Sequence, residues 1–223
     1  MKAVIAAESA AANAEQHLAR LDGVRVVLVP DALFQALATT ETTQGVIALV
    51  KPPEWTLDDV FQDRGTGGRS LVVVLDAVQD PGNAGNIVRT AEAFGATGAI
   101  FPKGAVSPFN AKTLRASAGS LFRLPFITGL DYFAVRTALS RHRVNVYAAM
   151  PQAKKAVDRV DLTSPVAFIV GSEGQGVSES LLQNALAIRI PTRGVESLNA
   201  AMAAGVLLYE ASRQRRLPQD DTR

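Results

Sequence analysis

The chain has 223 residues, 48% of them hydrophobic and 20% charged, which is ordinary composition for a globular protein with one large or two small domains. It contains no Cys and two His, so disulfides and thiolate metal sites are excluded, and zinc-hydrolase or Ser-His-Asp chemistry has almost no residues to use. The apolar runs are too short to span a membrane and no signal peptide follows Met1, so we expect a cytoplasmic protein without membrane or metal partners.

The formal net charge of +2 is unevenly distributed along the chain. Residues 1–69 carry 6 Lys and Arg against 9 Asp and Glu, whereas the remainder carries 17 against 12. A basic excess in the C-terminal part mildly favours a partner that bears phosphate groups, although a solvated surface explains it nearly as well.

Short apolar runs alternate with helical patterns at the start of the chain. Strands are predicted at 2–7, 24–29 and 46–50, and helices at 8–20 and 31–37, where Asp31 is expected to cap the second helix. Residues 51–69 hold two prolines and a run of Gly and charged residues, which is typical of a flexible connection. We therefore predict a small α/β domain at 1–52, a linker at 53–69 and a second domain at 70–223.

The same alternation continues through the second domain. Strands are predicted at 71–75, 98–101, 124–128, 144–149, 166–170 and 187–190. Helices are predicted at 84–94, 108–117, 131–141, from 178 onward and at 197–216. This alternation indicates an α/β fold with a mostly parallel sheet. The last helix has an unusual face of small residues at 199–205, which lets a helix lie very close to another backbone.

The stretch Asp76–Gly95 places a Gly-rich turn between a strand and a helix, as in a dinucleotide site. The spacing differs, because Gly82-Asn-Ala-Gly85 gives G-x-x-G and not G-x-G-x-x-G. The next strand also ends without the acidic residue that a ribose needs. Lys103 at that end is suited to a 2′-phosphate, so an NADP-dependent oxidoreductase remains a remote alternative.

Three stretches at the ends of predicted strands, taken together, resemble the motifs of one enzyme family. They are Asp80-Pro-Gly-Asn83 with Arg89 and Ala93-Phe-Gly95, then Ile169–Gly176, and then Ile190-Pro191 with Glu196–Asn199. Their order and spacing resemble the SpoU/TrmH family of RNA ribose 2′-O-methyltransferases, in the SPOUT class, over residues 70–216. The resemblance implies an α/β fold with a C-terminal trefoil knot, a rare exception to the rule that chains do not thread loops. It also implies S-adenosylmethionine held in the knot loops, and a homodimer with its sites near the interface.

The resemblance implies site residues position by position. The implied cofactor contacts are Gly171, Ile190 and Leu198, together with Glu173, Gly176 and Ala149. The implied functional polar residues are Asn83, Arg89, Glu173, Ser197 and Asn199.

Each of these polar residues also has a purely structural explanation. Asn83 and Ser197 are suited to capping a helix, and Glu173 is suited to lying beside a helix N-terminus. Arg89 is suited to a surface ion pair with Glu92. The motif context favours the functional interpretation over these alternatives.

Methyl transfer from a sulfonium to a ribose oxygen is an in-line displacement without a metal requirement, so positioning contributes much of the catalysis. Family mechanisms assign the motif arginine, here Arg89, as the base for the 2′-hydroxyl proton. A free guanidinium, however, stays protonated, since its pKa lies above about 12. We therefore favour a cationic Arg89 that binds an RNA phosphate and stabilises developing oxyanion charge, with Asn83 orienting the nucleotide and Glu173 and Asn199 holding the loops.

Family members with this arrangement usually begin with a longer RNA-binding domain of ribosomal-protein type. Its usual opening strand, which reads like Phe-Leu-Val-Glu-Gly, is not found here, so we expect the chain to start inside that domain. Residues 39–50 resemble the domain's end. A separate N-terminal domain with little basic charge favours structured ribosomal RNA over transfer RNA as the substrate. A transfer RNA ribose methyltransferase and a non-catalytic RNA-binding relative remain alternatives.

Overall fold

The computed structural model describes residues 2–18, 23–40, 42–62 and 69–216. The chain forms two compact units, Met1–Glu54 and Trp55–Arg223. The change from one unit to the other falls at the start of the segment 53–69, where we expected a linker.

The first unit contains a three-stranded sheet in the order β2-β1-β3. Its strands are β1 (Ala3–Ala7), β2 (Arg25–Val29) and β3 (Val46–Leu49), and β1 is parallel to β2 and antiparallel to β3. The helical segments are η1 (Glu8–Ala10), α1 (Ala11–Leu18) and α2 (Asp31–Leu37). Asp31 is the first residue of α2 and not its cap, which is Pro30. Its carboxylate instead accepts hydrogen bonds from the backbone N and the hydroxyl of Ser9.

A short helix, α3 (Leu57–Phe61), lies in the segment that was expected to be a linker. Thr56 and Asp59 form a capping box, in which Asp59 N donates to Thr56 Oγ1 at 3.2 Å and Thr56 N donates to Asp59 Oδ2 at 2.8 Å. The side chains of Val60 and Phe61 are buried in the core of the second unit. The linker prediction is therefore wrong for residues 57–61, because a capped helix with two apolar side chains docks there.

The second unit is built on a seven-stranded sheet in the order β6-β5-β4-β9-β7-β10-β8, and all its described strand pairs are parallel. The strands are β4 (Leu71–Asp76), β5 (Gly98–Pro102), β6 (Phe126–Leu130), β7 (Asn145–Ala149), β8 (Lys155–Ala156), β9 (Val166–Gly171) and β10 (Leu186–Arg189). The predicted α/β class with a mostly parallel sheet is confirmed. β8 was not predicted, because two residues are too few to show a periodic pattern.

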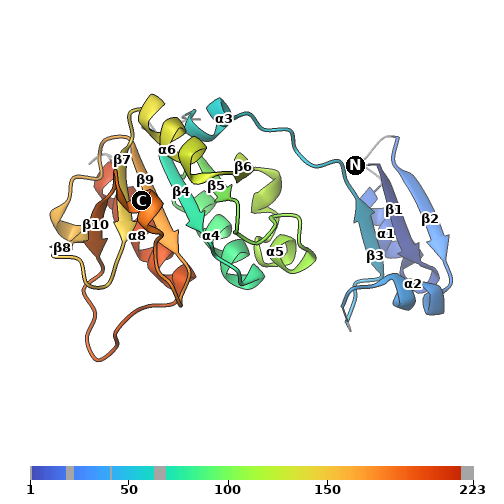
Figure 1. The fold of residues 1–223 in the computed structure, drawn as a ribbon. Helices are drawn as coiled ribbons and strands as arrows, with labels where there is room; N and C mark the ends of the chain where they lie inside the picture. The colour runs from blue at the N-terminus through green and yellow to red at the C-terminus, as the bar shows by residue number, and fades with distance from the viewer. Residues whose placement is uncertain (1, 19–22, 41, 63–68, 217–223) are drawn as a thin grey trace. The chain divides into compact units, whose positions relative to one another are not determined.

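Central strand β4 shows how side chains divide between the two faces of the sheet. Leu71, Val73 and Leu75 pack into one core cluster, while Val72 and Val74 pack into the other. The first face is covered by α4 (Pro81–Ala93), α5 (Ala111–Ala116), η2 (Ser120–Phe122), η3 (Val157–Arg159) and α8 (Ala200–Arg215). The second face is covered by α3, α6 (Tyr132–Arg141) and α7 (Glu179–Leu182), and Figure 1 shows α6 across the sheet from α4. In the described ranges, every helix falls short of the length and apolar character that crossing a lipid bilayer requires.

Helices α4 and α8, which border the later site, begin at other residues than predicted. α4 starts at Pro81 and not at 84, because the Asp80 carboxylate caps it by accepting from Asn83 N at 2.7 Å and Pro81 suits the first helical position. α8 starts at Ala200 and not at 197, because Asn199 is its cap. The small-residue face of α8 packs as expected: its first alanines are buried, and a Cβ on Gly205 would lie 3.5 Å from Thr90 Cγ2 of α4.

Strands β4 and β9 lie where the strand order reverses. β5 and β6 extend the sheet beyond β4, whereas β7 and β10 extend it beyond β9. The chain leaves β4 toward α4 on one face and leaves β9 toward α7 on the other. Such a switch point opens a crevice at the carboxyl ends of parallel strands, where ligands bind. In this sheet those ends are Asp76 and Gly171, which pair in register.

Candidate active site

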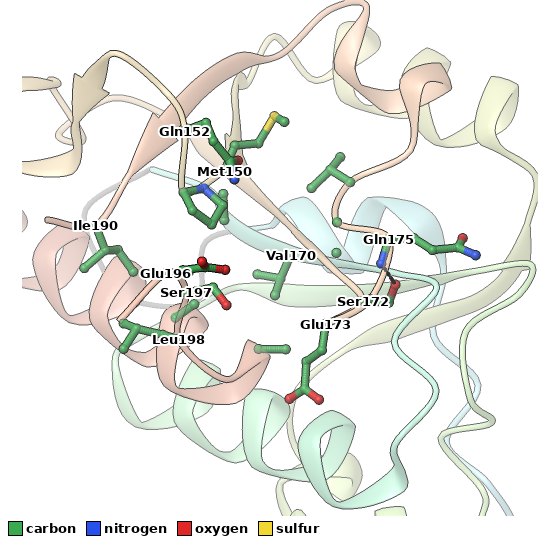
Figure 2. A pocket seen from close by; sticks show the side chains of 18 of the residues that line it. Met150, Gln152, Val170, Ser172, Glu173, Gln175, Ile190, Glu196, Ser197 and Leu198 are labelled. Atoms are coloured by element: carbon green, nitrogen blue, oxygen red, sulfur yellow. Dashed lines mark hydrogen bonds between the residues drawn. The ribbon is translucent and has the colours of Figure 1, made fainter. Parts of the chain in front are cut away.

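A cavity of about 360 Å³ lies at the carboxyl ends of β9, β7 and β10. It is formed by residues from three segments, 149–152, 170–177 and 188–203. All six residues that the sequence predicted as cofactor contacts line it: Ala149, Gly171, Glu173, Gly176, Ile190 and Leu198. Figure 2 shows Met150 and Gln152 on one side of the cavity, and the segment from Glu196 to Leu198 on another.

The loop after β9 turns back on itself. Gly176 N donates to Ser172 O at 2.9 Å, and the two residues form an isolated antiparallel bridge. A Cβ on Gly171 would lie 2.1 Å from the carbonyl carbon of Gly176, so the turn requires glycine at that position. The Cβ positions of Gly174 and Gly176 meet open space. Gly171, and Gly176 with its φ of +68°, therefore serve the fold of the loop itself, while Gly174 leaves room at the cavity.

A cluster of three polar side chains joins the motifs around Glu173, which Figure 2 shows at the edge of the cavity. Asn83 Nδ2 donates to Glu173 Oε1 at 3.1 Å, and Asn199 Nδ2 donates to the same oxygen at 2.5 Å. Asn199 Nδ2 also lies 3.1 Å from Asn83 Oδ1. The Glu173 carboxylate points away from Met150 and Gln152 on the far side. The structure thus brings α4, the loop after β9 and the start of α8 together through residues that the sequence singled out.

The structure does not show the capping roles suggested for Asn83 and Ser197, but it does place Glu173 beside helix N-termini, because Asn83 lies in the first turn of α4 and Asn199 is the cap of α8. Asp80, and not Asn83, caps α4. Asn199, and not Ser197, caps α8, because its Oδ1 accepts from Ala201 N at 2.9 Å and from Met202 N at 3.3 Å. Glu173 accepts hydrogen bonds from two side-chain amides. Asn83 is therefore free of a capping duty, whereas Asn199 both caps α8 and joins the polar cluster.

Ser197 and Glu196 lie in the segment that leads into α8. Both line the cavity, and both side chains are exposed. In Figure 2 they lie between Ile190 and Leu198 on one side and Val170 on the other. A hydroxyl and a carboxylate are thus placed on an otherwise largely apolar wall.

Arg89 is separate from the cavity of its own chain. Its side chain is exposed on α4 and does not line the cavity. Along an ideal helix it lies about 9 Å beyond Asn83 and roughly a third of a turn around the axis. The alternative of an ion pair between Arg89 and Glu92 is not what the structure shows, because Arg123 Nε donates to Glu92 Oε1 at 2.6 Å. Among the described residues Arg89 has no ion-pair partner, so its guanidinium is available to a phosphate.

The dinucleotide alternative loses its structural basis. Gly82 and Gly85 lie inside helix α4 and not in a loop before it. A Cβ on Gly85 would lie 2.5 Å from Thr113 O, so this glycine allows α5 to pack closely against α4. The G-x-x-G spacing therefore reflects the start of a helix and a helix contact.

Several residues of the cavity were not identified from the sequence. They are Met150, Pro151 and Gln152 after β7, and Thr192 before α8. Their position between a predicted strand and a predicted helix was the available signal, since ligands bind at the carboxyl ends of parallel strands. No chemical motif marks them.

Comparison with known families agrees with this geometry. The model described as the SpoU rRNA Methylase family matches residues 70–209 of the chain. A relative named "Uncharacterized tRNA/rRNA methyltransferase" from Mycobacterium sp. (strain KMS) is 33% identical over 204 residues, which are 90% of this chain and 65% of the relative. The chain thus spans somewhat less than two thirds of the length of that relative.

A second relative and a solved structure match this chain over a larger share of their own length. The 23S rRNA (guanosine(2553)-2′-O)-methyltransferase RlmP of Bacillus subtilis (strain 168) is 34% identical over 190 residues, 84% of this chain and 72% of that protein. The crystal structure of the SpoU methyltransferase AviRb from Streptomyces viridochromogenes in complex with the cofactor AdoMet matches with a TM-score of 0.86 at 28% identity. That match covers 96% of this chain and 83% of AviRb.

Proposed function

Because the chain belongs to the SpoU rRNA methylase family of S-adenosylmethionine-dependent RNA methyltransferases, we propose that it methylates a ribose 2′-hydroxyl in structured RNA. The observation that carries the proposal is the cavity at the carboxyl ends of β7, β9 and β10, beside which the residues of all three motifs meet. The intact cluster of Asn83, Glu173 and Asn199 favours an enzyme over a non-catalytic RNA-binding relative.

The cavity suits S-adenosylmethionine in size and lining. Its volume of about 360 Å³ lies within the range of small-molecule sites. Val170, Ile190 and Leu198 offer apolar surface to an adenine ring, and the backbone of the loop after β9 offers polar groups to the ribose. Glu196 adds a carboxylate that suits a cationic ligand. We assign the predicted contacts Ala149, Gly171, Glu173, Gly176, Ile190 and Leu198 to this cofactor.

When bound, S-adenosylmethionine supplies an electrophilic methyl group that a ribose 2′-oxygen displaces from sulfur. Asn83 orients the nucleotide, and Glu173 and Asn199 fix the two cavity loops relative to α4. Ser197 presents its hydroxyl at the cavity wall, toward the entering ribose. These groups act by positioning, which is the main requirement of an in-line displacement.

Arg89 acts as a cation in this proposal. It binds an RNA phosphate and stabilises the negative charge that develops on the ribose oxygen, while the hydroxyl proton leaves to water at this exposed site. Its lack of an ion pair among the described residues supports this role. Because Arg89 does not line the cavity of its own chain, it fits a site that a second subunit completes.

A homodimer is therefore part of the proposal. Met202, Val206 and Tyr209 are 61%, 39% and 45% exposed and form one stripe along α8, whose first residues line the cavity. Burial of this stripe between two copies would place two sites near the interface. Light scattering on the wild-type chain and on Met202→Lys tests this proposal. We expect the wild type to be a dimer and Met202→Lys to be a monomer. A monomeric wild type would contradict the proposal.

The remaining assignments follow from the family. We propose that the C-terminal segment is threaded as a trefoil knot, which the packing of α8 against α4 and the meeting of the two cavity loops support. We propose that the first unit contacts RNA, that the substrate is ribosomal RNA, as for RlmP, and that the protein works in the cytoplasm. A transfer RNA substrate is the second candidate, since the mycobacterial relative is named for both RNAs.

Calorimetric titration with S-adenosylmethionine, S-adenosylhomocysteine and NADPH tests the cofactor assignment. We expect saturable binding of the first two at one site per subunit and no binding of NADPH. Binding of NADPH alone contradicts the proposal.

A further inference from the structure

The carboxyl end of β4 holds a carboxylate that the proposed reaction does not use. Asp76 is 0% exposed and is the one acidic side chain that is buried in the described part of the chain. No Lys or Arg of the described residues pairs with it. A buried carboxylate is unfavourable unless hydrogen bonds satisfy it, so its position calls for a structural or functional reason.

The contacts of Asp76 lead to the end of the cavity loop. Its Oδ2 accepts a hydrogen bond from the backbone N of Ser178 at 2.6 Å, across 102 positions of sequence. The Tyr132 hydroxyl at the start of α6 lies beside the same carboxylate: burial first, and then hydrogen bonding to Asp76 and its negative charge, raise the pKa of that hydroxyl. Asp76 therefore joins β4 to the residue that precedes α7, while its Oδ1 is buried without a hydrogen-bond partner among the described residues.

The same residue also fixes the beginning of the loop. Its backbone pairs in register with Gly171, the last residue of β9. The loop between Gly171 and Ser178 is thus held at its first residue by the backbone of Asp76 and at its last by the side chain. Residues 173–176 between these two points are exposed, and within the loop the Ser172–Gly176 bridge and the hydrogen bonds that Glu173 accepts from Asn83 and Asn199 add to these two holds.

We propose that Asp76 is a positioning residue, whose carboxylate holds Ser178 and thereby keeps the loop after β9 in the shape that binds the cofactor. The inference rests on the proposed function, because the loop forms one wall of the cofactor cavity. Tyr132 supports the carboxylate from α6. Without this hold, the ligand itself must order the end of the loop at Ser178. The apparent affinity for the ligand then falls in proportion to the fraction of molecules in which the loop is preformed.

Two measurements on four variants test the proposal: hydrogen exchange of the peptide 171–178 in the ligand-free protein, and calorimetric affinity for S-adenosylhomocysteine. The variants are Asp76→Ala, Asp76→Asn, Tyr132→Phe and a control, Val135→Ala, which opens a gap in the buried face of α6 and leaves Asp76, Tyr132 and Ser178 intact. Asp76→Asn keeps one acceptor for Ser178 N, so it is the conservative member of the series.

We expect Asp76→Ala to speed exchange in 171–178 and to raise the dissociation constant by about tenfold or more, with smaller effects for Asp76→Asn and Tyr132→Phe. Val135→Ala should lower the melting temperature and leave both readouts unchanged. If Asp76→Ala does not fold, Asp76→Asn and Tyr132→Phe are compared with the same Val135→Ala control. Equal exchange and equal affinity in these variants and in the control overturn the inference. Failure of the wild type to bind the ligand counts against the proposed function instead, and exchange still reports on the hold of Asp76.

Discussion

Asn199 carries two duties through two different atoms, and this allows them to be separated. Its Oδ1 caps α8, while its Nδ2 reaches Glu173 and Asn83. Serine is as good a helix cap as asparagine but is too short to extend to the cluster. The residue therefore offers a direct comparison between fold and chemistry.

We expect Asn199→Ser to keep the free energy of unfolding within about 0.5 kcal/mol of the wild type, and Asn199→Ala to lose about 1 kcal/mol. Both variants should lower the rate of methyl transfer by roughly a hundredfold, because the two cavity loops are no longer held in position relative to α4. Urea unfolding measures the free energy of unfolding, and initial rates measure methyl transfer. Full activity in Asn199→Ser would show that capping is the whole role of this residue.

Arg89→Lys isolates the role of the guanidinium fork. Lysine keeps the positive charge but not the planar set of donors, so we expect kcat to fall by about a hundredfold. The affinity for S-adenosylhomocysteine should not change, because Arg89 does not line the cavity. Near-wild-type kcat would argue against any special role for the guanidinium.

The candidate site residues were predicted through the resemblance of three motifs to the SpoU/TrmH family, which implied them position by position. Glu173 and Asn199 lie in loops whose glycines and polar residues are visible in the sequence. Asp76 was passed over because its importance depends on Ser178, which meets it only in the fold. The separation of Arg89 from the cavity also depends on the position of α4 in the fold. The spacing of residues in the sequence does not predict that position.

At the scale of elements, the contact between α3 and β5 depends on the absence of a side chain. A Cβ on Gly98 would lie 2.7 Å from Val60 Cα and 2.8 Å from Val60 O. Gly98→Ala should therefore destabilise the second unit by about 2–3 kcal/mol, as overpacking does. Gly174→Ala, whose Cβ would meet open space, is the control for stability in urea unfolding. Equal stability of the two variants would mean that α3 does not pack here.

A second link between elements depends on pH. Arg123, which follows η2, lowers the pKa of the Glu92 carboxyl on α4, mainly through a side-chain hydrogen bond. The stabilisation is present above the ordinary carboxyl pKa of 4.5 and is lost as the pH falls through the lower folded-state pKa. Thermal melts of Glu92→Gln should thus differ from wild type at neutral pH and converge with it in acid. A constant difference across the pH range would contradict this linkage.

The sequence predicted the long elements and missed the short ones for physical reasons. Buried strands such as β4 and β9 are continuous apolar runs, which few other structures explain. Helix α3 was not predicted, because the neighbouring prolines and glycines favoured a linker. Thr56 and Asp59 nevertheless have the spacing of a capping box. The start of α4 was readable from Asp80 followed by Pro81, but the glycines after them favoured a loop.

At the scale of the molecule, the division into two units separates the cavity from the N-terminal sheet. Every residue that lines the cavity lies in the second unit. A fragment of residues 55–223 should therefore fold and bind S-adenosylhomocysteine within about twofold of the full chain. Its affinity for RNA should fall by about tenfold or more, since the first unit is proposed to supply part of the RNA surface. Filter binding at fixed salt checks this, and unchanged RNA affinity would remove the first unit from the substrate site.

The proposed reaction of the chain is methylation of a ribose 2′-oxygen in RNA. The most direct test incubates the protein with S-adenosylmethionine that carries a labelled methyl group and with unmodified ribosomal RNA transcripts, and then identifies the methylated nucleoside by mass spectrometry. We expect one 2′-O-methylnucleoside, formed at a single position and strongly reduced with Arg89→Lys. A methyl group on a base, or an unmethylated RNA despite bound cofactor, would contradict it.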